Sequence, residues 1–117
     1  MSKEKKTPNP ELLSLIRTLK KEKSNFWKAV AKNLEISTRR KRIINISKIN
    51  RLAKDNEIIV VPGKVLSQGS LSKNVKIAAY QFSDSAKNKL KSNAITIQDL
   101  LKQKPKTSEL RILVWWL

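Results

Sequence analysis

The amino-acid sequence predicts an α/β fold, in which an N-terminal helical part is followed by short strands interleaved with helices. Two observations carry this prediction. In the first half of the chain, apolar residues recur at the spacing of amphipathic helices. In the second half this period is lost, and the apolar, β-branched run Ile58-Ile59-Val60-Val61 is typical of a strand buried on both faces.

The first half predicts three helices. The first begins at Asn9-Pro10, because Asn can accept the first amide hydrogens of a helix and Pro fits its first turn. The second covers residues 25–34 and the third residues 47–54. The apolar faces of these three helices are, in order, Leu12, Leu13, Ile16 and Leu19; Trp27, Val30, Ala31 and Leu34; and Ile46, Ile49 and Ala53.

The second half predicts strands and two short helices. We expect the strand at residues 57–61 to stop at Pro62-Gly63, with a further short strand at residues 64–66 and another at residues 75–82. Ser83-Asp84 is typical of a helix start, and residues 96–99 fit a capping box for a second helix that Pro105 ends. Residues 110–117 predict a terminal strand.

Composition excludes several classes of protein. The 117 residues include no Cys and no His, so disulfides, thiolate metal sites and imidazole acid–base chemistry are excluded. No apolar run approaches the ~18 residues that span a bilayer, and no signal-peptide pattern is present. We expect residues 1–8 to form a flexible basic arm. Residues 9–117 are expected to form one domain, with a helical part at about 9–55 and an α/β part at about 56–117.

The charge balance indicates an anionic partner of large area. Twenty-six Lys and Arg against nine Asp and Glu give a formal charge of +17, which repels itself unless an anion lies against it. The excess is spread over both halves of the chain, so the folded body itself is basic. Nucleic acid is therefore the leading partner class.

The densest basic run is Arg39-Arg40-Lys41-Arg42, which is predicted to lie in a loop between two helices. Guanidinium groups bind phosphate oxygens in pairs, and no acidic residue between Glu35 and Asp55 neutralises the run. The alternative is an ordinary solvated charge run. The other candidate RNA-binding residues lie on the arm, on outer helix faces and near turns: Lys3, Lys5, Lys6, Arg17, Lys20, Lys21, Lys48, Arg51, Lys64 and Lys73.

No catalytic residue, metal site or cofactor is predicted. Lys64 follows Pro62-Gly63, but the glycine spacing and the Ser/Thr of a nucleotide-binding loop are missing. A turn that presents Lys64 to a phosphate and a purely structural turn both remain open. The few aromatic residues favour recognition by backbone and shape over base stacking. The competing functions are a DNA-binding architectural or chromatin protein, an enzyme and, more weakly, a membrane-surface binder.

A series of motifs resembles the archaeal and eukaryotic large-subunit ribosomal protein family numbered eighteen, a relative of the universal family numbered fifteen. The most specific piece is Val60-Val61-Pro62-Gly63-Lys64-Val65-Leu66. The other pieces follow in family order: Asn9-Pro10 with residues 12–16, Trp27 with Val30 and Ala31, Arg39-Arg40, residues 45–49, and residues 78–83. The Trp115-Trp116-Leu117 ending is not a family feature.

The resemblance implies a structural component of the large ribosomal subunit, of archaeal type, located in the cytoplasm within the ribosome. It implies an irregular superhelix of strand and helix turns after an N-terminal helical portion. The implied partners are large-subunit ribosomal RNA and neighbouring large-subunit proteins, without a membrane, a small-molecule substrate, a cofactor or catalysis.

Overall fold

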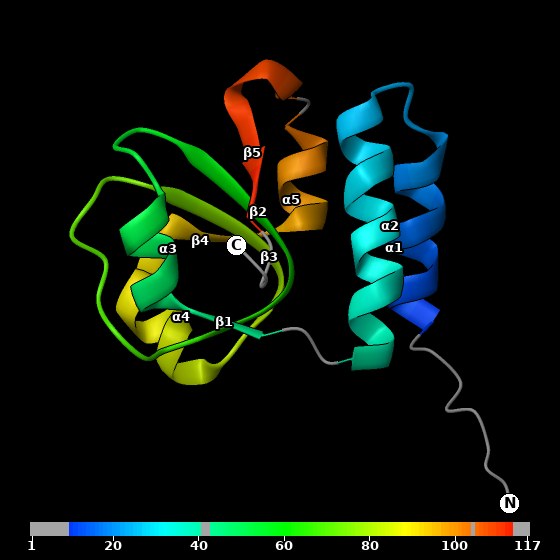
Figure 1. The fold of residues 1–117 in the computed structure, drawn as a ribbon. Helices are drawn as coiled ribbons and strands as arrows, with labels where there is room; N and C mark the ends of the chain where they lie inside the picture. The colour runs from blue at the N-terminus through cyan, green and yellow to red at the C-terminus, as the bar shows by residue number, and fades with distance from the viewer. Residues whose placement is uncertain (1–9, 41–42, 104, 114–117) are drawn as a thin grey trace, which may run out of the picture.

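The computed structural model of the chain describes residues 10–40, 43–103 and 105–113. Their sheet is covered by helices on both faces, which confirms the predicted α/β class (Figure 1). The elements in chain order are α1 (Pro10–Lys21), α2 (Asn25–Arg40), β1 (Ile43–Asn45), α3 (Ile46–Leu52), β2 (Ile58–Leu66), β3 (Lys76–Phe82), α4 (Asp84–Leu90), the 3-10 turn η1 (Lys91–Asn93), β4 (Ala94–Thr96), α5 (Ile97–Lys102), the 3-10 turn η2 (Thr107–Glu109) and β5 (Leu110–Ile112).

The strands form a five-stranded sheet within the described residues, and every pairing is parallel. Its order is β1-β2-β3-β4, and β5 also pairs with β2. β3 lies along one edge of β2, while β5 pairs with residues 58–60 and β1 with residues 64–66. β2 is therefore the central strand, and two short strands divide its second edge between them.

Each face of the sheet packs into its own hydrophobic core. Val60 and Ala78 face the core that α1, α2 and α5 cover, whereas Ile59 and Ile77 face the core that α3 and α4 cover. The two helical layers lie on opposite sides of the sheet in Figure 1. Because both faces are buried, β2 carries apolar residues without alternation, as predicted.

The prediction that β2 stops at Pro62-Gly63 is wrong, because the strand runs on to Leu66. Its register against β3 shifts by one residue between Val61 and Lys64, so Pro62 and Gly63 together lie opposite Tyr80. Such a bulge accommodates a residue without an N–H inside a sheet. The predicted short strand at residues 64–66 is thus the second half of β2.

The second helix is longer than predicted. It continues from residue 34 to Arg40, so Arg39 and Arg40 belong to a helix and not to a loop. No Pro or Gly interrupts residues 25–40, and helix-compatible residues such as Glu35 and the arginines allow the backbone bonding to continue. The chain then enters β1, a strand that was not predicted, before α3.

The predicted caps of the two later helices are confirmed. The Ser83 hydroxyl accepts a hydrogen bond from the Ala86 N–H at 3.1 Å, and the Thr96 hydroxyl accepts one from the Asp99 N–H at 3.0 Å. α1 begins at Pro10, and its buried face is Leu12, Leu15, Ile16 and Leu19, where Leu13 was expected in place of Leu15. Asn9 lies outside the described residues.

The terminal strand is shorter than predicted within the described residues. β5 ends at Ile112, and the Leu113 N–H donates to the Val60 carbonyl at 2.9 Å. Residues 114–117, including Trp115 and Trp116, lie outside the described residues. The division of the domain near residue 55 stays a prediction, although α3 packs into the sheet's second core rather than against α1 and α2.

Candidate nucleic-acid interface

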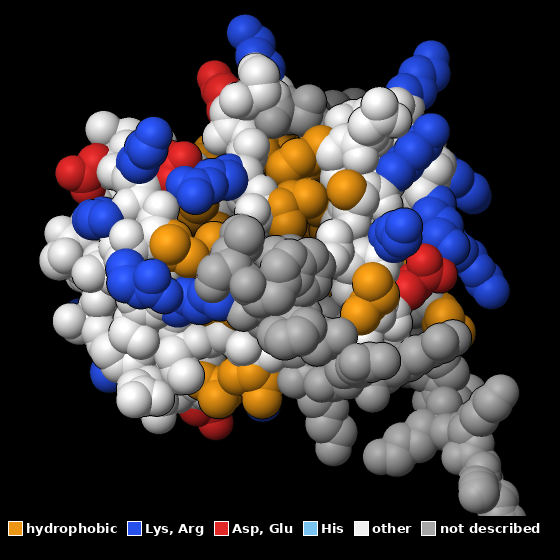
Figure 2. All heavy atoms as spheres, viewed as in Figure 1, with side chains coloured by type: hydrophobic (Ala, Val, Ile, Leu, Met, Phe, Trp, Pro, Cys, Tyr) orange, Lys and Arg blue, Asp and Glu red, His pale blue; other side chains and the backbone are white. Residues whose placement is uncertain are grey.

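Charged side chains lie on the surface of the molecule. No charged or polar side chain is buried among the residues that the structure describes. In Figure 2, Lys and Arg side chains project over the α1–α2 side and around α3, and acidic side chains are fewer in this view. The surface therefore offers cations from both helical layers, as a binder of an extended polyanion requires.

The cations of α1 differ in their surroundings. Arg17, Lys20 and Lys21 are all exposed. Lys20 Nζ lies 2.9 Å from Glu35 Oε2, in a pair whose side chains are 54% and 47% exposed. Such an exposed pair contributes little to stability, but it places a carboxylate beside that lysine. Arg17 and Lys21 make no polar contact within the described part of the chain.

The predicted basic run and the basic arm are only partly described. Lys3, Lys5, Lys6, Lys41 and Arg42 lie outside the described residues, and so do the side chains of Arg39 and Arg40. The backbone places the last two residues in the final turn of α2, just before β1. On α3, Arg51 is exposed and Lys48 is half-buried.

Lys64 and Lys73, the two candidates near turns, differ in their contacts. Lys64 is exposed on β2, directly after the bulge. Lys73 is half-buried, and its Nζ donates to the Ala53 carbonyl at 2.6 Å. The Lys73 ammonium thus holds the loop that joins β2 to β3 against the end of α3.

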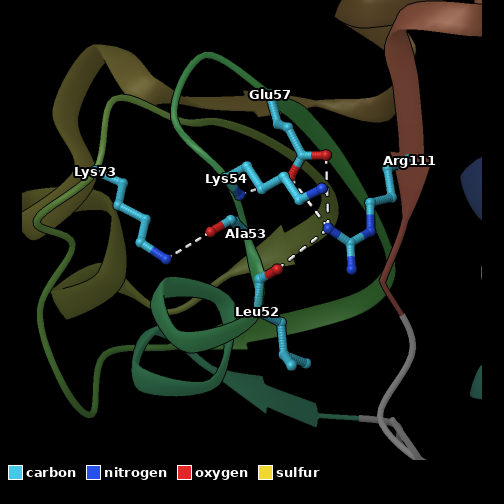
Figure 3. A network of polar contacts seen from close by, with 6 residues as sticks. All are labelled: Leu52, Ala53, Lys54, Glu57, Lys73 and Arg111. Carbon is cyan, nitrogen blue, oxygen red and sulfur yellow. Dashed lines mark hydrogen bonds and ion pairs between the residues drawn. The ribbon is translucent and has the colours of Figure 1, made fainter.

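Arg111 joins β5 to the loop between α3 and β2 (Figure 3). Its Nη1 donates to the Leu52 carbonyl at 3.1 Å and to Glu57 Oε1 at 3.2 Å. The same carboxylate oxygen accepts the Lys54 N–H at 2.7 Å. The guanidinium therefore stabilises three segments of the fold at once. Sequence reasoning assigned Arg111 no such role, since its partners lie more than fifty residues away.

Two further bonds hold the loop at residues 67–75, which carries the chain from β2 to β3. Lys89 Nζ donates to the carbonyls of Ser67 and Gly69 at 2.7 and 2.8 Å. Gly69 has a φ of 99°, and a Cβ there would lie 2.5 Å from Ser47 Cβ. This glycine is required both by its conformation and by its close approach to α3.

The carboxyl ends of β3 and β4 border a basic groove. One hollow of about 280 Å³ is lined by Lys64, Tyr80, Gln81, Phe82, Lys87 and Thr96. A second of about 260 Å³ shares Phe82, Lys87 and Thr96 and adds Lys91, Ala94, Ile95 and Asp99. We call these residues together the strand-end groove. Of its lysines, only Lys64 was among the predicted binding residues.

The Tyr80 hydroxyl remains protonated near neutral pH. Desolvation by burial raises the pKa of Tyr80, and the Glu11 carboxylate adds to that rise. Tyr80 therefore lines the groove as a neutral residue.

The described residues show no membrane-spanning or metal-binding feature. None of their helices has the length and apolar character needed to cross a membrane. They also contain no group of three or more acidic residues placed to hold a metal ion.

Comparison with known proteins identifies the family. The family model described as ribosomal protein 60S L18 and 50S L18e matches residues 1–114. The chain belongs to this family. The resemblance inferred from the motifs is thus confirmed, and the chain is a ribosomal protein and not an enzyme.

Curated archaeal relatives agree with this family. The large ribosomal subunit protein eL18 of Methanosphaerula palustris is 45% identical over 115 residues, which cover 92% of this chain and 95% of the relative. The protein of the same name from Archaeoglobus fulgidus is 42% identical over 113 residues, covering 91% and 97%. That of Methanococcus maripaludis is 39% identical over 112 residues, covering 90% and 93%.

Proposed function

We propose that the protein is a structural constituent of the large ribosomal subunit that binds and stabilises folded large-subunit ribosomal RNA through phosphate and shape contacts. The observation that carries the proposal is the outward placement of cations on both helical layers of a member of the eL18 family. Its location follows from its family and is the ribosome in the cytoplasm.

Exposed cations on separate elements favour contact with more than one RNA segment. Arg17 and Lys21 lie on α1, Arg51 on α3 and Lys64 on β2. The helical layers that carry Arg17, Lys21 and Arg51 lie on opposite sides of the sheet. The protein would therefore neutralise phosphates where RNA helices meet, which stabilises RNA tertiary structure.

The basic arm and the basic run complete the proposed interface. Lys3, Lys5 and Lys6 supply charge before α1, and residues 39–42 supply four cations around the end of α2. Lys20 and Lys48 are further candidates on α1 and α3. Lys73 is a weaker candidate than Lys64, because its ammonium already donates to the Ala53 carbonyl. Neighbouring large-subunit proteins are the second class of partner.

Sedimentation of native cell extract tests the structural role. Gradient fractions are analysed by mass spectrometry before and after a high-salt wash. Near one copy per large subunit after the wash supports the proposal. Complete loss of the chain to a free or DNA-bound pool would contradict it and favour the chromatin alternative.

Salt-dependent binding tests the phosphate contacts. Affinity for a large-subunit ribosomal RNA transcript is measured against salt for the wild type and for a variant with Arg39, Arg40, Lys41 and Arg42 replaced by Ala. Each lost phosphate contact reduces the slope of log affinity against log salt by roughly 0.9. Duplex DNA at equal phosphate serves as the competitor. An unchanged slope removes the basic run from the interface.

A further inference from the structure

The strand-end groove combines positive charge with aromatic surface at one place. Lys64, Lys87 and Lys91 are exposed, and the ammonium group of none of them makes a hydrogen bond or an ion pair within the described residues. Among the described residues, Asp99 is the one carboxylate that lines the groove, at the second hollow. The groove therefore has a net positive charge, with its acidic member at one end.

The lining of the groove differs from an ordinary lysine-rich surface. Tyr80 and Phe82 are half-buried residues that line the first hollow together with Lys64 and Lys87. Gln81 and Thr96 add an amide and a hydroxyl at the same hollow. Aromatic faces bordered by cations are what unstacked bases and their phosphates bind, because every base has a π face.

Backbone strain at Lys91 is a separate observation at the same groove. Lys91 has a φ of 50° and a ψ of −121°, a conformation that side-chain-bearing residues seldom adopt. Strain of this kind persists where the surrounding structure holds it, often at functional sites. Here it holds a lysine, where glycine would fit with less strain, at the edge of the second hollow.

We propose that the strand-end groove binds one unpaired, unstacked nucleotide of ribosomal RNA, with its phosphate against Lys64 and Lys87 and its base against Phe82. The proposal rests on the proposed function and deepens it, because it replaces a general phosphate contact with a single-nucleotide site. A base inside a helix is covered on both faces by its neighbours, so only an extruded nucleotide can reach aromatic side chains in a hollow.

Ultraviolet cross-linking of the full-length protein to its large-subunit ribosomal RNA transcript tests this site directly. Trypsin releases residues 77–87 as one peptide that carries both Tyr80 and Phe82. We expect a nucleotide adduct on this peptide, and we expect the attached nucleotide to be unpaired in the RNA. An adduct on that peptide from a base-paired nucleotide would overturn the single-strand assignment.

Matched variants test the energetic role of the groove. Phe82→Leu keeps apolar packing against the second core but removes the aromatic face, and affinity should fall roughly tenfold. The double variant Lys64→Ala with Lys87→Ala should reduce the slope of log affinity against log salt by the amount that roughly two phosphate contacts contribute. Lys28→Ala with Lys32→Ala, two exposed lysines of α2, serves as the charge-matched control and should reduce affinity less than the groove pair. Thermal unfolding confirms that each variant is folded.

The outcomes distinguish failure of the groove site from failure of the proposed ribosomal RNA-binding function. If the wild type binds the transcript with a steep salt slope, but residues 77–87 carry no adduct and Phe82→Leu binds normally, the groove site is wrong and the proposed function stands. If the wild type shows no preference for the transcript over duplex DNA, both proposals fall. Carbodiimide cross-links from Lys64 or Lys87 to an acidic segment of a neighbouring protein in purified subunits would assign the groove to a protein partner instead.

Discussion

The loops around α3 and the strand-end groove use the same kind of side chain in opposite ways. In the loops, the cationic groups of Lys73, Lys89 and Arg111 donate to backbone carbonyls of distant segments. In the groove, Lys64 and Lys87 have no such partner within the described residues. The count of basic residues therefore overstates the charge available for the proposed RNA contacts, since part of it stabilises the fold.

This difference predicts two separable classes of variant. Changes at the loops should lower the free energy of unfolding and leave the salt dependence of RNA binding unchanged. Changes at exposed cations that hold no carbonyl should alter the salt dependence and leave stability within about 0.5 kcal/mol, except at Lys91, where the backbone is strained.

Gly69→Ala should have the largest effect. The new Cβ would lie 2.5 Å from Ser47 Cβ at a φ of 99°, so the loop must leave α3. We expect a loss of about 3 kcal/mol in the free energy of unfolding, measured by urea denaturation. Ser70→Ala, at the exposed neighbouring position, is the control and should change stability little. Equal stability of the two variants would show that the close approach is not required.

Arg111→Ala should destabilise the fold by about 2 kcal/mol, because it leaves the Leu52 carbonyl and the Glu57 carboxylate without their charged donor. The side chains of Arg111 and Glu57 are 39% and 25% exposed, so water replaces part of the lost interaction. Arg111→Lys keeps the charge but not the planar group, and it should recover only part of the loss. A change in the salt slope without a loss of stability would place Arg111 among the RNA-binding cations.

Lys91→Gly should separate the effect of backbone strain at this position from the effect of the lysine's positive charge. Glycine adopts a φ of 50° without steric cost, so the free energy of unfolding should rise by about 1 kcal/mol. RNA binding should nevertheless weaken, since a groove cation is lost. Lys91→Ala removes the same charge and keeps the strain, so it should weaken binding without the gain in stability. If both variants have the same stability, strain at this position is negligible.

The smallest effect is expected for two cations of α1, Arg17 and Lys20. Arg17→Ala should reduce the slope of log RNA affinity against log salt by the amount that roughly one phosphate contact contributes. Lys20→Ala should reduce it less, because Glu35 lies 2.9 Å from the Lys20 ammonium and competes with phosphate. Glu35→Gln should then raise affinity slightly. A larger slope change for Lys20 than for Arg17 would show that the ion pair opens on binding.

Local patterns in the sequence predicted much of the fold. Ser83 and Thr96 cap α4 and α5 as expected, and the uninterrupted apolar run of β2 indicated burial on both faces. The three-residue strands β1 and β4 were missed, because three residues are too few to show a period. The site was predicted less well. Lys64 was named among the candidate binding residues, but Lys87 and Lys91 were not.

The α/β class, the helix starts, the excess of positive charge and the family could be inferred from the sequence, because each depends on composition or on short runs of residues. The continuation of β2 through Pro62-Gly63, the structural roles of Lys73 and Arg111, and the groove that Tyr80, Lys87 and Lys91 share with Lys64 became visible only in the folded chain. These features depend on contacts between segments that are distant in sequence. The side chain of a lysine is the same whether it meets a carbonyl or solvent, and only packing decides which partner lies within reach.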